Sequence, residues 1–96
     1  MKNLEILKNI EKFINNKEIN KAREAFAKIE GLGDKNIFKD HNYLFLRAKL
    51  AYLEKLYYFA IDTLLIGLNF STEKKFYDFL GDMYNEVGNV ELSKKI

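Results

Sequence analysis

The stretch that decides the fold reads Tyr77-Asp78-Phe79-Leu80-Gly81-Asp82-Met83-Tyr84. Tyr77, Leu80 and Tyr84 recur at intervals of three and four residues, the spacing that puts side chains on one face of an α-helix. Gly81 lies between them, and so small a residue lets a second helix approach closely. The stretch therefore predicts one helix of a tightly packed helical pair.

The same spacing extends outward over the rest of the chain. Apolar residues recur from Leu4 to Ile14 and from Ile19 to Ile29, and we expect further helices over about 41–54, 57–69, 72–87 and from near Val90. Residues 15–17 and 31–40 read as turns or loops. Connections this short make neighbouring helices antiparallel. The chain has no Pro and five Gly in 96 residues, which also favours helices. The predicted fold class is all-α, in one domain spanning residues 1–96.

Polar residues and glycines mark the expected helix ends. Gly31 is predicted to end the second helix in a left-handed conformation. Asp40 is predicted to cap the third helix, and Ser71 or Thr72 the fifth, because short oxygen-bearing side chains accept hydrogen bonds from the first turn of a helix.

Three hairpins, at about 3–30, 41–69 and 72–96, can be overlaid. Their first helices read Ile6-x-x-Asn9-Ile10-x-x-Phe13, Leu44-x-x-Arg47-Ala48-x-x-Ala51 and Tyr77-x-x-Leu80-Gly81-x-x-Tyr84, and their second helices place Ala22, Ala60 and Ser93 at similar positions. The pattern resembles the tetratricopeptide repeat family, whose repeat is about 34 residues long. The resemblance covers nearly the whole chain and is strongest in the third hairpin.

Several positions depart from the family pattern. Ile10 stands where a small residue is usual, Arg47 stands where Leu is usual, and no hairpin has the closing Pro. The third repeat reaches Ile96 before its second helix is complete. We therefore expect either a domain of a longer protein or an end that docks on another molecule.

The resemblance implies a short right-handed solenoid of antiparallel hairpins. It also implies a protein-interaction scaffold, in which the first helix of each hairpin lines a concave groove that holds a peptide or a helix. Matched positions give the candidate groove residues, namely Leu7, Glu11, Phe45, Lys49, Tyr52, Asp78, Asp82 and Asn85. This set is apolar and aromatic at first and acidic at its end, so the expected ligand has an apolar segment followed by basic residues. The alternative is that Leu4 and Leu7 are core residues.

Some family members hold an acidic tail in a clamp of Lys, Asn and Arg. The matched positions here are Leu7, Glu11, Leu46, Lys75 and Phe79. Only Lys75 fits, so this clamp is not expected.

Two other functions stay open. The second hairpin is apolar almost all round, which predicts burial on every side. Its central position explains part of this pattern, and self-association into a homo-oligomer would explain the rest. The chain could also be an accessory domain beside a catalytic domain elsewhere in a longer protein.

Little in the chain predicts chemistry. His41 is the only histidine and there is no Cys, so neither a metal site nor a cofactor site is expected, and the chain does not read as an enzyme. Asp78 and Asp82 could form an acid–base or metal pair, but a solvated face or a site for a basic peptide fits them better.

The charges are mixed along the chain. Sixteen basic and fourteen acidic residues give a net charge of +2, which does not favour nucleic-acid binding. Short lysine runs such as Lys74-Lys75 have acidic neighbours and read as solvated. No apolar run is long enough to cross a membrane, and the N-terminus does not read as a signal peptide. A cytoplasmic protein is expected.

Overall fold

The computed structural model describes residues 2–88, and this part of the chain is entirely helical, with no strand. The elements are α1 (Lys2–Asn15), α2 (Ile19–Glu30), the short 3₁₀-helix η1 (Lys35–Lys39), α3 (His41–Leu53), α4 (Tyr57–Gly67) and α5 (Lys74–Glu86). The all-α prediction is confirmed. The further helix predicted near Val90 lies outside the described residues.

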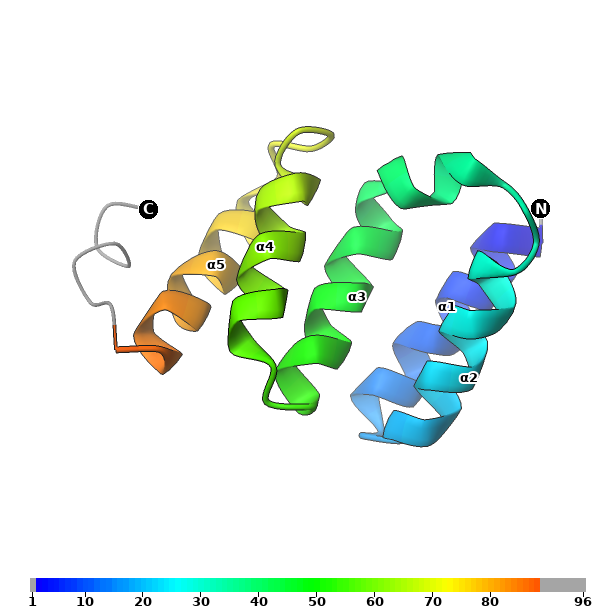
Figure 1. Ribbon diagram of the computed structural model, residues 1–96, viewed down its shortest axis with the longest axis horizontal. Helices are drawn as coiled ribbons and strands as arrows, with labels where there is room; N and C mark the ends of the chain where they lie inside the picture. The colour runs from blue at the N-terminus through cyan, green and yellow to red at the C-terminus, as the bar shows by residue number, and fades with distance from the viewer. Residues whose placement is uncertain (1, 89–96) are drawn as a thin grey trace.

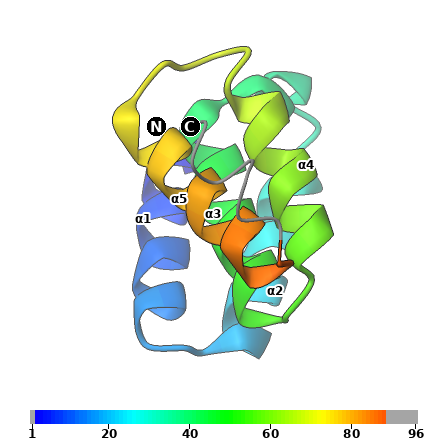
Figure 2. The ribbon, with the colours of Figure 1, turned by 90° about the vertical axis from the view of Figure 1, so that its left-hand side faces the viewer.

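Figure 1 shows α1 and α2 running in opposite directions, and α3 and α4 doing the same. Viewed from the α5 end, α3 lies between α1 on one side and α4 on the other (Figure 2). The helix α3 packs against α1, α2 and α4, and α4 packs in turn against α5. The helix α3 is therefore the central element of the described residues.

The two hairpins turn in the same way. Lys17 and Lys55 both adopt a positive φ, of 58° and 64°. After each of them, a backbone N–H donates back across the turn: Glu18 to the carbonyl of Phe13 and Leu56 to the carbonyl of Ala51, both at 2.8 Å. This is the Schellman arrangement, which ends a helix and reverses the chain.

The loop between the hairpins differs from its prediction. Gly31 is right-handed, with a φ of −79°, so the prediction of a left-handed cap there is wrong. Instead, the left-handed residue is Gly33, at a φ of 81°. The chain continues as a helical turn past Gly31 and changes direction only before η1.

Two predicted caps have different outcomes. Asp40 accepts hydrogen bonds from the backbone N–H groups of Asn42 and Tyr43, at 2.8 and 3.2 Å, so this cap is confirmed. The cap of α5 is Glu73, which makes no side-chain capping bond, so the prediction of Ser71 or Thr72 is wrong. Ser71 instead accepts from the Glu73 N–H and orders the loop ahead of the helix.

Two hydrophobic clusters share α3. Leu44, Leu46 and Leu50 belong to the cluster with α1, α2 and η1, whereas Ala48 and Ala51 belong to the cluster with α4 and α5. Because α3 buries opposite faces in different clusters, its sequence is apolar on nearly every side. The prediction of burial on every side therefore fits α3.

Arg47 connects the two hairpins. Its guanidinium carbon lies 5.4 Å from the ring centre of Phe26 in α2 and 5.0 Å from that of Phe59 in α4. One guanidinium nitrogen is buried without a hydrogen bond and lies 3.9 Å from a carboxylate oxygen of Glu54, which also pairs with Arg23. An arginine suits this position because its flat cation stacks on aromatic rings.

The helix α4 is not buried on every side by the described residues. One of its faces leaves large apolar side chains exposed, namely Tyr58, Phe59, Leu65 and Ile66. Tyr58 is the most open of these, at 71% exposure, and Asp62 is the only charged residue in α4.

Candidate functional site

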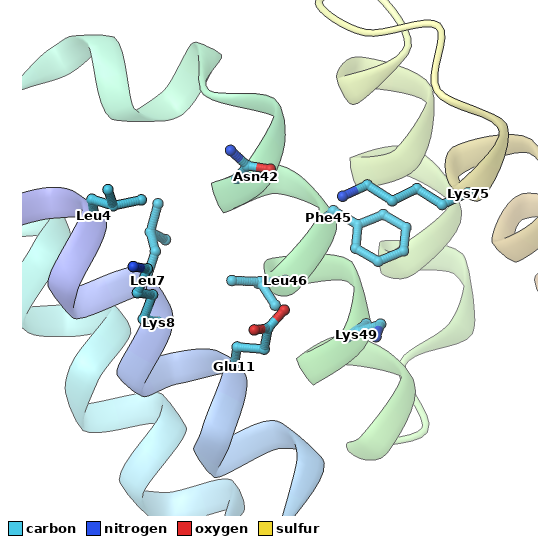
Figure 3. A pocket seen from close by; sticks show the side chains of 9 residues that line it. All are labelled: Leu4, Leu7, Lys8, Glu11, Asn42, Phe45, Leu46, Lys49 and Lys75. Atoms are coloured by element: carbon cyan, nitrogen blue, oxygen red, sulfur yellow. The ribbon is translucent and has the colours of Figure 1, made fainter.

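An open cleft of about 490 Å³ lies between α1 and α3 and extends to the start of α5. We call it the α1–α3 cleft. It is lined by Leu4, Leu7, Lys8, Glu11, Asn42, Phe45, Leu46, Lys49 and Lys75 (Figure 3). The cleft therefore contains four of the predicted groove residues: Leu7, Glu11, Phe45 and Lys49.

The apolar floor of this cleft is partly core. Leu7 is 5% exposed and Leu46 is 7% exposed, and both belong to the cluster of the first hairpin. Leu4, one helical turn before Leu7, is 52% exposed. The alternative that Leu4 and Leu7 are core residues thus fits Leu7 but not Leu4. Leu7 supports the cleft from below, and Leu4 offers open apolar surface at its edge.

Lysines surround the aromatic ring in the cleft. The Nζ atoms of Lys75 and Lys49 lie 4.7 and 5.2 Å from the ring centre of Phe45. Figure 3 shows Lys75 reaching from α5 toward this ring. Lys8 adds a third cation from α1, against a single carboxylate, that of Glu11. The cleft is therefore basic as well as apolar.

A second cleft, of about 310 Å³, lies between the last turns of α3 and α5. We call it the α3–α5 cleft. Its lining residues are Tyr52, Phe79, Asp82, Met83, Asn85 and Glu86. Three of the predicted groove residues are here: Tyr52, Asp82 and Asn85. Two carboxylates and no cation line this cleft, so it is acidic and aromatic.

Aromatic rings connect the two clefts. The ring centre of Phe79 lies 5.6 Å from that of Phe45 and 6.0 Å from that of Tyr52, each pair meeting edge to face. Edge-to-face contacts of this kind are favourable and hold the rings in fixed orientations. Phe45, Phe79 and Tyr52 thus form a continuous aromatic stripe from the basic cleft to the acidic one.

Asp78 is the one predicted residue that lines neither cleft. Its two carboxylate oxygens accept from the ammonium of Lys74, at 3.2 and 2.9 Å. This exposed pair lies one helical turn apart on α5, which is a common surface arrangement. Asp78 therefore has a cationic partner on its own helix, whereas Asp82 lines the α3–α5 cleft.

The clefts are also lined by Lys8, Leu46, Phe79 and Met83, none of which was predicted as a groove residue. Helical spacing could have found Lys8, because Leu4, Lys8 and Glu11 follow one face of a helix. No such local signal marks Leu46, which reaches the cleft only because α1 lies beside α3.

The described residues offer few groups that could bind a metal ion. Within residues 2–88, no three His, Cys, Asp or Glu side chains lie close enough together to hold a metal ion. His41 contacts Glu73 through Nε2, at 3.1 Å, and so joins the start of α3 to the start of α5. None of the described helices is long and apolar enough to cross a membrane.

No protein-family model, no curated protein and no solved structure matches this chain.

Proposed function

We propose that this chain is a tetratricopeptide-like array of helical hairpins. Its support is the repetition of one turn: Lys17 and Lys55 have the same left-handed backbone and are followed by the same hydrogen bond. Five residues after each of these lysines, Ala22 and Ala60 are fully buried, where a small side chain permits close helix packing. In this proposal the hairpins stack as a short right-handed solenoid, with α5 beginning the third.

We further propose that the array binds a segment of another protein along the face made by α1, α3 and α5. The α1–α3 cleft carries this proposal, because its volume of about 490 Å³ is in the range of ligand pockets. It combines open apolar surface at Leu4 with the partly buried ring of Phe45. Aromatic side chains in such positions often contribute much of the binding free energy at protein interfaces.

Selection from a displayed library of random peptides tests this function. Peptides should be enriched on the immobilised full chain, and the Phe45→Ala and Tyr52→Ala variants should each lose most of that enrichment. Tyr58→Ala is the matched control, since Tyr58 is an exposed aromatic residue on α4, which lines neither cleft. Peptides that bind both cleft variants as well as the wild type would show that the binding face is wrongly assigned.

Self-association is the second candidate, and the open face of α4 favours it. Isolated exposed apolar residues are common, but contiguous groups of them often mark interfaces. Sedimentation velocity over micromolar concentrations should then show a dimer that Leu65→Glu dissociates. A wild-type chain that stays monomeric over this range would exclude this candidate and leave peptide binding as the proposed function.

A further inference from the structure

The two clefts carry opposite charge along one face of the molecule. We propose that the partner is a peptide segment with two charged side chains, an acidic one bound in the α1–α3 cleft and a basic one in the α3–α5 cleft. An apolar side chain between them would lie on the aromatic stripe of Phe45, Phe79 and Tyr52. This inference rests on the proposed function and adds the chemistry of the bound segment and the cleft that each charged side chain occupies.

The acidic side chain is assigned by the lysines of the α1–α3 cleft. Among the described residues, no carboxylate lies within ion-pair distance of Lys8 or Lys49. Lys75 pairs with Glu73 at 3.6 Å, but both side chains are more than 40% exposed, so the pair is weak. An incoming carboxylate would find two ammonium groups beside one ring and a third on the opposite wall. Charge-assisted hydrogen bonds to ammonium groups are stronger than neutral ones.

The basic side chain is assigned by the α3–α5 cleft. Asp82 and Glu86 have no cationic partner among residues 2–88, in contrast to Asp78 with its Lys74. The rings of Tyr52 and Phe79 line the same cleft. A guanidinium or ammonium group is attracted both to carboxylates and to the faces of aromatic rings. This combination fits a cation better than it fits any other side chain.

The helix ends add to this polarity. Asn42 and Lys75 belong to the first turns of α3 and α5, whereas Tyr52 and Glu86 belong to their last turns. The start of a helix has partial positive charge and its end has partial negative charge. The backbone of both helices therefore reinforces the charge that the side chains give each cleft.

The positions of Lys75, Asp82 and Glu86 along α5 give the distance between the basic and the acidic side chains of this face. Lys75 precedes Asp82 by seven positions and Glu86 by eleven, so they lie about 10 to 16 Å apart along the helix axis. An extended peptide advances about 3.3 Å per residue. The acidic and basic side chains of the partner should therefore be about three to five residues apart.

The peptide proposed here differs from the ligand that the sequence predicted. The sequence predicted an apolar segment followed by basic residues, because the matched positions are mostly apolar in the first two hairpins, with Lys49 as their only cation, and mostly acidic in the third. The structure adds Lys8 to this cleft and shows Lys75 extending into it from the third hairpin. The apolar end of the face is therefore also its basic end.

The first test examines the peptides selected from a random library on the full chain. The enriched sequences should contain one acidic and one basic residue at a constant order and spacing, with an apolar residue between them. Enriched sequences without paired charges that still require Phe45 would overturn this inference and leave the proposed function standing. No enrichment at all would overturn both.

The second test exchanges charges between the chain and a selected peptide. Lys75→Glu should weaken binding about tenfold or more, and a peptide with Lys in place of its acidic residue should regain affinity for this variant. Asp82→Lys should behave in the same way toward a peptide with Glu in place of its basic residue. The controls are Lys74→Glu and Asp78→Lys, which make the same charge reversals at residues that line neither cleft. Both controls should have little effect on affinity.

Other occupants give different results in these tests. Selected peptides could contain an acidic residue but no basic one, and their binding could be unaffected by Asp82→Lys. That result would place the ligand in the α1–α3 cleft alone and overturn the proposal of two charged sites. Dimerisation of the wild-type chain that Lys75→Glu abolishes would make a second copy the occupant and would also overturn the proposal.

Discussion

Gly67, the last residue of α4, lies directly against the Phe76 ring of α5. A Cβ atom built on Gly67 would be 2.5 Å from Cε1 of Phe76, closer than real side chains approach. Phe76 is completely buried, and its ring also contacts that of Phe45 at 5.1 Å between centres. The absence of a side chain at one position in α4 thus lets α5 hold an aromatic residue behind the ring of Phe45, which lines the α1–α3 cleft.

Gly67→Ala should therefore destabilise the protein, by about 1–3 kcal/mol, because the methyl group displaces a buried ring. Urea denaturation measures the loss. The double variant Gly67→Ala/Phe76→Leu is the control: a smaller ring-free side chain leaves room, so Gly67→Ala should be less harmful in that background. Equal effects of Gly67→Ala in both backgrounds would show that the contact with Phe76 is not the cause.

Lys17→Gly and Lys55→Gly should each stabilise the protein. Both lysines adopt a left-handed backbone, which is strained for a residue with a side chain by about 1–2 kcal/mol. Glycine relieves this strain but makes the unfolded chain more flexible, so a net gain of up to about 1 kcal/mol is expected. Thermal unfolding checks the pair. Because the two turns have the same geometry, gains at one site and losses at the other would contradict their equivalence.

The unfolding free energy should fall as the pH rises above 10, and Tyr43 should account for part of that fall. Its pKa lies well above the ordinary 10.0, because the ring is buried and its hydroxyl donates to Glu30 at 2.5 Å. Below pH 10 the hydroxyl is protonated in both states. Above that pH the unfolded chain loses this proton first, so unfolding becomes easier.

Tyr43→Phe isolates this contribution. Urea denaturation at about pH 8 and about pH 11 should show a smaller loss of stability for the variant than for the wild type. Every other group is shared by the two proteins, so its contribution to the pH dependence cancels in the comparison. An equal loss in the two proteins would show that Tyr43 titrates normally in the folded state.

Most of the helical architecture was predictable from local patterns. The helix α3, over His41–Leu53, matches the range expected from its apolar spacing and its cap at Asp40, because both signals depend only on nearby residues. The handedness of the turns was not predictable at Gly31. Several backbone conformations satisfy a glycine in a loop, and two glycines lie close together here, so the local sequence does not decide which of Gly31 and Gly33 is left-handed.

The candidate face was predictable residue by residue but not as a whole. Seven of the eight predicted groove residues line a cleft, but they divide between two clefts of opposite charge. Lys75 reaches the first cleft because its long side chain crosses from α5 to Phe45. Such reach depends on the distance between helices that are far apart in sequence. Arg47 is similar, since only the positions of α2 and α4 show why a cation lies on this largely apolar helix.

The most direct test of the central claim is to map a selected peptide on the isotopically labelled full chain by amide chemical-shift changes. Binding along the α1–α3–α5 face predicts the largest changes at and around Lys8, Phe45, Lys49 and Asp82, with little change from Tyr58 to Ile66 in α4. Phe45→Ala should remove these changes without altering the rest of the spectrum. Changes concentrated on α4, with the residues of the two clefts unaffected, would contradict the account.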